Sequence, residues 1–220
     1  MTLDPSRFDA WVFDMDDTLY PREQGLMGLV QGRINAFMID AVGLPAAEAK
    51  VLQRQFLNEH GTTLAGLMAN YAIDPEHFLR EVHDVPLDGV EPNPDLARLL
   101  RGLPGRKFVL TNGARFHAGR VLEHIGIADC FDGVFAIEDM DLTPKPAPAT
   151  FRRFLERFEI DPHRAIFFED TPRNLAPAKA IGMTTVLIGD GHGHEIGNWV
   201  DHQSDYLMDF LSPLSLKDAA

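Results

Sequence analysis

Asp14, Asp16 and Thr18 follow the apolar run Trp-Val-Phe at positions 11–13. The run predicts a buried strand, so both carboxylates lie where that strand would leave a parallel sheet, the edge at which such sheets build active sites. One carboxylate there could attack an electrophile while its neighbour moves a proton. Two carboxylates in one turn also repel each other unless a cation lies between them. The motif indicates covalent chemistry beside a metal, and a helix cap or a solvated turn is the alternative.

Hydrogen-bond donors follow at two later positions. Thr111, Asn112 and Gly113 come after the apolar run Phe-Val-Leu, where a hydroxyl and exposed backbone N–H groups can donate to an anionic oxygen. The alternative for this cluster is a plain Asn-Gly turn. Lys145 lies between two prolines, so its backbone is rigid and non-helical, and the alternative is an ordinary surface lysine.

A second acidic pair, Glu169 and Asp170, ends the apolar run Ala-Ile-Phe-Phe. Because the carboxyl ends of parallel strands meet at one edge of a sheet, we expect all four clusters to lie together. Carboxylate oxygens suit a hard cation, and Mg²⁺ is the usual one beside a phosphate. A metal, a lysine and a hydroxyl together stabilise charge on a transferring phosphoryl group. The combination therefore predicts phosphoryl transfer.

Short apolar stretches without alternation predict strands that are buried on both faces of a sheet. The predicted strands are Trp11–Asp14, Lys107–Thr111, Gly133–Ile137, Ala165–Glu169 and Thr184–Ile188. Helical patterns separate them, with one apolar face at Ala118, Val121, Leu122 and Ile125 and another at Phe151, Phe154, Leu155 and Phe158. This alternation predicts an α/β fold with a Rossmann-like, doubly wound parallel sheet.

Residues 21–90 break that alternation, because they show helical patterns and no convincing strand. The predicted helices are Met27–Val42, Ala46–His60, Thr63–Tyr71 and Pro75–Val82. We expect residues 1–20 and 91–220 to form the α/β core domain and residues 21–90 to form an inserted α-helical cap subdomain. The Gly- and His-rich segment 189–205 is predicted to be a flexible loop, and its histidines at 192, 194 and 202 receive no role.

Composition limits the partners of the chain. A formal net charge of −13 over 220 residues disfavours nucleic acid polymers and anionic membranes, and a small phosphorylated metabolite is the expected partner. Cys130 is the only cysteine, so no intrachain disulfide is possible and a reducing, cytoplasmic location is expected. Residues 1–5 show no signal peptide, and no apolar run approaches the roughly 20 residues of a membrane helix. No pattern predicts an oligomeric state.

The four motifs, in this order, resemble those of the phosphatases of the haloacid dehalogenase superfamily, over nearly the whole chain. The helical insert is similar to the C1 cap of that superfamily. The resemblance implies that Asp14 is the nucleophile that forms an aspartyl-phosphate. It implies that Asp16 protonates the leaving alcohol and then activates water, a role that dehalogenases of the superfamily lack.

The same resemblance assigns the remaining groups. It implies that Thr111, with neighbouring backbone amides at Asn112 and Gly113, holds the phosphate oxygens, and that Lys145 orients the nucleophile and neutralises charge. The ligands that it implies for Mg²⁺ are the Asp14 carboxylate, the Asp16 backbone carbonyl and Asp170, with Glu169 acting directly or through water. Among the nearby residues, Asn174 is a further candidate for supporting the metal. Arg115 and Arg173 are interpreted either as phosphate anchors or as solvated surface residues, and His117 receives no role.

The stretches Phe13–Pro21 and His60–Leu67 resemble the pyrimidine 5′-nucleotidase group, including its plant and bacterial relatives. That resemblance implies a pyrimidine nucleoside 5′-monophosphate as substrate and a recognition role for Thr62 and Thr63. The residues alone predict only a helix N-terminus with capping hydroxyls at these threonines. Four alternatives remain: a phosphatase of a sugar phosphate or phosphoglycolate, a phosphomutase, a receiver-type phosphoaccepting module and a binding-only member of the superfamily.

Overall fold

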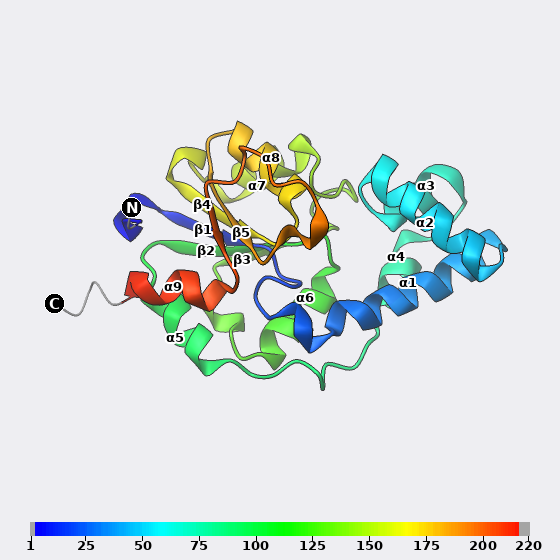
Figure 1. Ribbon diagram of the computed structural model, residues 1–220, viewed down its shortest axis with the longest axis horizontal. Helices are drawn as coiled ribbons and strands as arrows, with labels where there is room; N and C mark the ends of the chain where they lie inside the picture. The colour runs from blue at the N-terminus through cyan, green and yellow to red at the C-terminus, as the bar shows by residue number, and fades with distance from the viewer. Residues whose placement is uncertain (1–2, 216–220) are drawn as a thin grey trace.

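One sheet of six parallel strands, in the order β3-β2-β1-β4-β5-β6, forms the centre of the computed structural model, which describes residues 3–215 (Figure 1). The strands are β1 Ala10–Phe13, β2 Arg106–Leu110, β3 Gly133–Phe135, β4 Ala165–Glu169, β5 Thr184–Ile188 and β6 His202–Ser204. The strand order reverses beside β1, as it does in doubly wound folds. The predicted α/β class and parallel sheet are confirmed.

The sixth strand corrects the expectation of a flexible loop over residues 189–205. β6 pairs with β5 in the register Val186↔His202, and the Gly189 N–H donates to the Ser204 carbonyl at 2.8 Å. Its sequence, His-Gln-Ser, contains no apolar run, since an edge strand need not be buried and these three side chains are exposed or partly exposed. Periodicity therefore gave no signal for it.

Helices cover both faces of the sheet. They are α5 Pro94–Gly102, α6 Arg115–His124, α7 Pro148–Phe158, α8 Pro172–Ala180 and α9 Leu207–Ser215. On one face Trp11 and Phe13 of β1 pack in a cluster with α5, α6 and α9. Val12, which points the other way, packs in a cluster with α7 and α8. Short 3-10 helices complete the chain at Pro5–Arg7, Arg22–Gln24, Ala128–Cys130, Pro162–Arg164 and Gly191–Gly193.

The insert after β1, which the structure describes in full, contains helices joined by short loops and no strand, as predicted. Its α-helices are α1 Leu26–Val42, α2 Ala46–His60, α3 Thr63–Asn70 and α4 Pro75–His83. Capping residues define its breaks: Gly43 ends α1 in the left-handed region, and Thr62 and Asp74 cap α3 and α4. In Figure 1 the four helices lie together beyond one edge of the sheet.

We propose that these helices form the cap subdomain, with the boundaries at residues 20 and 91 that the sequence predicts. The predicted core domain includes residues 1–2 and 216–220, which lie outside the described residues. The prediction that residues 1–5 contain no signal peptide also falls partly on residues 1–2. No helix within residues 3–215 has both the length and the apolar character needed to cross a bilayer.

Candidate active site

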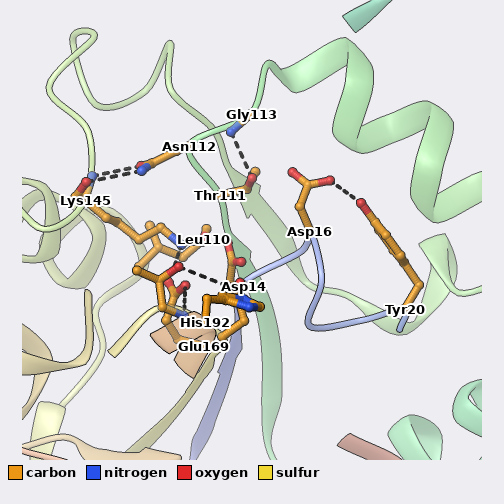
Figure 2. A network of polar contacts seen from close by, with 12 residues as sticks. Asp14, Asp16, Tyr20, Leu110, Thr111, Asn112, Gly113, Lys145, Glu169 and His192 are labelled. Carbon is orange, nitrogen blue, oxygen red and sulfur yellow. Dashed lines mark hydrogen bonds and ion pairs between the residues drawn. The ribbon is translucent and has the colours of Figure 1, made fainter. Parts of the chain in front are cut away.

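The carboxyl ends of β1, β2 and β4 bring three of the predicted motifs to one edge of the sheet (Figure 2). Asp14 follows β1 directly, and its N–H donates to the Phe168 carbonyl of β4 at 2.8 Å. Thr111 follows β2, and its N–H donates to the Phe135 carbonyl of β3 at 3.0 Å. The sheet ladder therefore continues into the site and fixes the backbone from which these side chains project.

Lys145 reaches this edge from the loop between β3 and α7 and is almost fully buried, at 1% exposure. Its Nζ donates to Asp14 Oδ1 at 2.6 Å, to Glu169 Oε2 at 2.7 Å and to the Leu110 carbonyl at 2.8 Å. All three protons of the ammonium are thus directed at named acceptors. The alternative of an ordinary surface lysine is wrong.

Asn112 holds the backbone that carries Lys145. The Lys145 N–H donates to Asn112 Oδ1 at 2.8 Å, and Asn112 Nδ2 donates to the Lys145 carbonyl at 3.2 Å. The side chain of Asn112 therefore ties the end of β2 to the lysine loop. The contact with substrate that the sequence predicts for Asn112 is left to its backbone N–H and to the second proton of Nδ2.

The electrostatics of this cluster call for additional positive charge. Burial raises the pKa of Asp14 to about 8, and the charge of Glu169 adds to that shift. Burial likewise raises the pKa of Glu169 to about 7. Burial alone would lower the pKa of Lys145, but the two carboxylates hold it above its usual range. One ammonium thus faces two buried carboxylates and cannot neutralise both.

Asp16 points away from Lys145, toward the start of the insert. Its Oδ1 accepts from the Tyr20 hydroxyl at 2.6 Å and lies 3.5 Å from His117 Nε2. Burial alone would raise the pKa of Asp16, but the contacts with His117 and Tyr20 hold it below its usual range. The two aspartates of the first motif therefore have different surroundings, as different chemical roles would require.

Thr111 and Gly113 form a small concave edge next to Asp16. The Gly113 N–H donates to Thr111 Oγ1 at 2.9 Å. A Cβ added at Gly113 would lie 3.2 Å from Thr111 Oγ1 and 3.5 Å from Asp16 Oδ2, so the absent side chain leaves this space open. Because the Thr111 hydroxyl accepts from Gly113, its own proton is left to donate to an anionic oxygen in this space.

Asp170 lies beside the buried carboxylates. Oxygen atoms of Asp14, Glu169 and Asp170 all lie within 4.8 Å of one another, which is a spacing that one metal ion could bridge. The sequence predicted these three as metal ligands, and the structure brings them together. Asn174, the further candidate, is buried with its Oδ1 lacking a hydrogen-bond partner within residues 3–215.

His192 also reaches the site, although the sequence pattern around it predicts only a flexible loop. Its Nε2 lies 2.5 Å from Asp170 Oδ2, and its Nδ1 contacts the Arg22 guanidinium. His192 belongs to the turn that follows β5, at the same edge of the sheet as the motifs. The only feature of the sequence that could have predicted this role is the position of His192 just after a strand. His192 and Asp170 are too far apart in the chain to share a helical or strand repeat.

The other basic residues lie outside the cluster. The guanidinium of Arg115 contacts Asp139, and the Arg115 N–H donates to Glu138 at 3.0 Å. Arg173 donates to two carbonyls of the insert, those of Leu57 at 3.3 Å and Gly61 at 3.4 Å. Arg173 therefore links α8 of the core to the end of α2.

A cavity of about 250 Å³ opens above the cluster, between the sheet edge and the insert. The insert contributes mainly apolar side chains to its lining, namely Met27, Val30, Ile34, Leu57, Leu64, Phe78, Leu79 and Val82. The polar groups from the insert are Gln31, Thr62, Thr63 and His83. Among the described residues, Lys145 is the only lysine or arginine in the lining. Thr62 and Thr63 therefore face the same cavity as the strand-end motifs.

Comparisons with known proteins agree with this architecture. A family model described as a haloacid dehalogenase-like hydrolase matches residues 8–182. The chain is 28% identical to phosphate metabolism protein 8 of Saccharomyces cerevisiae, over 96% of this chain and 71% of that protein. It is 28% identical to a phosphoglycolate phosphatase of Rhodospirillum rubrum, over 84% of this chain and 81% of that protein. A phosphatase structure from Thermococcus onnurineus shares the fold, with a TM-score of 0.64 at 22% identity over 94% of this chain and 98% of that one.

Proposed function

We propose a specific catalytic mechanism for this chain, which belongs to the haloacid dehalogenase-like hydrolase family. It is a hydrolase of phosphoric monoesters, in line with its phosphatase relatives. In the proposal Asp14 is the nucleophile, Asp16 is the acid and base, and the preferred substrate is a pyrimidine nucleoside 5′-monophosphate. The observation that carries it is the buried contact of Lys145 with Asp14 and Glu169, beside a second aspartate with separate partners.

In the first step a carboxylate oxygen of Asp14 forms a bond to phosphorus, and the bond from phosphorus to the ester oxygen breaks. Lys145 holds Oδ1, and Oδ2 accepts no hydrogen bond from residues 3–215, so Oδ2 is the free nucleophile. Asp16 gives its proton to the leaving oxygen. A phosphate dianion brought beside Asp16 raises the pKa of this carboxyl, which favours the protonated form at that moment.

In the second step water attacks the phosphorus of the aspartyl-phosphate. Asp16, now ionised, takes a proton from that water, and the bond between phosphorus and the Asp14 oxygen breaks to release phosphate. The Thr111 hydroxyl, which accepts from the Gly113 N–H, donates its own proton to a phosphate oxygen throughout. Each proton that Asp16 donates in the first step is thus recovered in the second.

A divalent metal fits the donor set of this site. Asp14, Glu169 and Asp170 present buried oxygens within 4.8 Å of one another, and hard oxygen ligands suit Mg²⁺. We propose that Asp14 and Asp170 hold it with the Asp16 backbone carbonyl, and that Glu169 acts directly or through water. Bound there, Mg²⁺ would offset the charge of the carboxylates and of the phosphoryl group.

The lining of the cavity indicates the class of leaving group. The insert presents a mostly apolar surface with a few hydrogen-bonding groups and, within the described residues, no lysine or arginine. A leaving group with a carboxylate, such as glycolate, would have no cation to pair with on that side. An uncharged group with apolar faces, such as a nucleoside, fits the lining better. A sugar phosphate is the second candidate, supported by a relative named as a fructose-1-phosphate phosphatase of Escherichia coli.

A phosphate-release screen with Mg²⁺ tests this proposal. We expect UMP and CMP to be hydrolysed with a higher kcat/KM than sugar phosphates or phosphoglycolate, because only a nucleoside covers the apolar lining. We expect a chelator to abolish release from all of them and added Mg²⁺ to restore it. Equal rates for UMP and phosphoglycolate would contradict the nucleotide assignment, whereas activity that survives chelation would contradict the role of the metal.

Thr62 and Thr63 allow a separate test of substrate recognition. Thr63 is buried and faces the cavity, whereas Thr62 Oγ1 already accepts from the Ala65 N–H at 3.1 Å as the cap of α3. We expect Thr63→Ala to reduce the preference for UMP over sugar phosphates by about 10-fold, the effect of one lost hydrogen bond to substrate. We expect Thr62→Ala to reduce the same preference and also to lower the free energy of unfolding by about 1 kcal/mol, because the cap of α3 is lost.

The control for this experiment is Thr62→Ser, which keeps the capping hydroxyl and should behave as the wild type. Steady-state kinetics on UMP and a sugar phosphate, together with thermal unfolding, separate the two effects. A ranking of substrates that is unchanged in both alanine variants would remove these threonines from substrate recognition.

A further inference from the structure

His117 is buried without a satisfied hydrogen bond. It lies near the N-terminus of α6, its exposure is 0%, and neither of its ring nitrogens has a hydrogen-bond partner within residues 3–215. Buried polar groups are nearly always paired, because an unpaired one loses its bonds to water without replacement. A leucine of similar size would fill the same space without that cost. The imidazole therefore calls for an explanation other than packing.

A carboxylate faces His117, that of Asp16, the proposed acid and base of the reaction. His117 Nε2 lies 3.5 Å from Asp16 Oδ1, slightly beyond the length of a full hydrogen bond. A Cβ added at Gly113 would lie 3.6 Å from His117 Cδ2, so the Cδ2–Nε2 edge of the ring faces Gly113 and Asp16. The imidazole is thus directed at the carboxylate rather than at the interior of the sheet.

The two oxygens of Asp16 have separate surroundings. Oδ1 accepts from Tyr20 at 2.6 Å and faces His117, whereas Oδ2 is directed toward Gly113 (Figure 2). Gly113 and Thr111 form the concave edge proposed to hold the phosphate. Donors on Oδ1 therefore leave Oδ2 as the oxygen that faces a bound phosphate ester.

A second histidine fixes the plane of the His117 ring. His83, from α4 of the insert, stacks on it with a centroid separation of 4.5 Å and an interplanar angle of 29°. The His83 ring is held in turn by its Nδ1, which lies 2.9 Å from the Leu79 carbonyl and so donates to it. The orientation of His117 thus depends on contacts from the core and from the insert.

We propose that His117 is a positioning residue for Asp16, holding Oδ1 through Nε2–H so that Oδ2 delivers the proton to the leaving oxygen. The inference rests on the proposed function, because it assumes that Asp16 is the acid. His117 itself makes and breaks no bond in the reaction. The stack with His83 makes this positioning sensitive to the placement of α4.

Two aryl esters of nearly the same shape test the proposal. In phenyl phosphate the leaving oxygen is strongly basic and needs the proton of Asp16, whereas p-nitrophenolate leaves without one. The ratio kcat/KM reports the first step only, up to release of the phenol. For His117→Leu we expect kcat/KM to fall about 10-fold or more with phenyl phosphate and by less than about 3-fold with p-nitrophenyl phosphate.

Two further variants complete the experiment. His117→Gln places an amide N–H near the position of Nε2, so we expect it to recover most of the activity on phenyl phosphate. His124→Gln changes another histidine of the same helix, distant from Asp16, and should leave both rates unchanged. Thermal unfolding of His117→Leu should show a midpoint equal to or above that of the wild type, since the leucine leaves no polar atom unpaired.

The outcomes separate this inference from the function on which it rests. Equal losses on the two esters, or a leucine variant as active as the wild type, would overturn the positioning role while the phosphatase stands. A glutamine variant no better than the leucine variant would do the same. A wild-type protein that hydrolyses neither ester with Mg²⁺ would overturn the proposed mechanism, and this inference with it.

Discussion

Replacement of Asp14 by asparagine is expected to abolish hydrolysis of every phosphate ester, with kcat reduced by about 10⁴-fold or more. The amide oxygen is a poor nucleophile and cannot form the aspartyl-phosphate. The fold should survive, because an asparagine oxygen can still accept from Lys145, and the substitution removes one of two buried charges that repel each other. Phosphate release at saturating substrate, with circular dichroism to monitor folding, measures both effects.

A matched control for this variant lies at the other end of the same strand. Asp9 precedes β1, is exposed and pairs with Arg164. Asp9→Asn changes the same chemical group at the amino end of the sheet, and we expect wild-type kcat and KM from it. Robust turnover by Asp14→Asn would eliminate the covalent mechanism.

Lys145→Met is expected to reduce kcat by about 10³-fold, because the nucleophile loses its orienting ammonium and the phosphoryl charge loses a cation. It should also lower the free energy of unfolding by about 3 to 5 kcal/mol, the usual effect of removing one partner from a buried ion pair. Asp14 and Glu169 would then lie buried with no protein cation between them. Saturating Mg²⁺ should recover part of the lost stability.

Lys107 provides the control for that substitution. It is a second buried lysine, but within residues 3–215 its Nζ donates only to the backbone carbonyls of Leu103 at 3.0 Å and Gly105 at 2.8 Å, near the amino end of β2. Lys107→Met should lower stability and leave kcat near the wild-type value. If both methionine variants lost stability equally and neither lost turnover, Lys145 would be a structural residue.

The edge of the sheet that carries the site could be predicted from local sequence. Apolar runs without alternation located β1, β2 and β4, and the polar residues that end each run are the ones that meet in space. Flanking prolines singled out Lys145. These signals are readable because each depends on residues adjacent in the chain, and the geometry of a parallel sheet then brings the strand ends together.

The contacts that could not be predicted join segments with no local pattern. His192 meets Asp170 across the turn after β5, and His83 stacks on His117 between the insert and the core. Strand β6 was missed because an edge strand needs no apolar run. Such contacts depend on how loops and helices pack, which periodicity within one segment does not report.

The covalent intermediate on Asp14 is the central claim, and the mass of a trapped phosphoenzyme tests it most directly. Asp16→Asn removes the base of the second step, while p-nitrophenyl phosphate needs no acid in the first. With that ester and Mg²⁺, acid-quenched Asp16→Asn protein should therefore gain the mass of one phosphoryl group, located on the peptide that contains Asp14. The double variant with Asp14→Asn should gain none. No phosphoryl group on that protein, or one located on a different residue, would contradict the account.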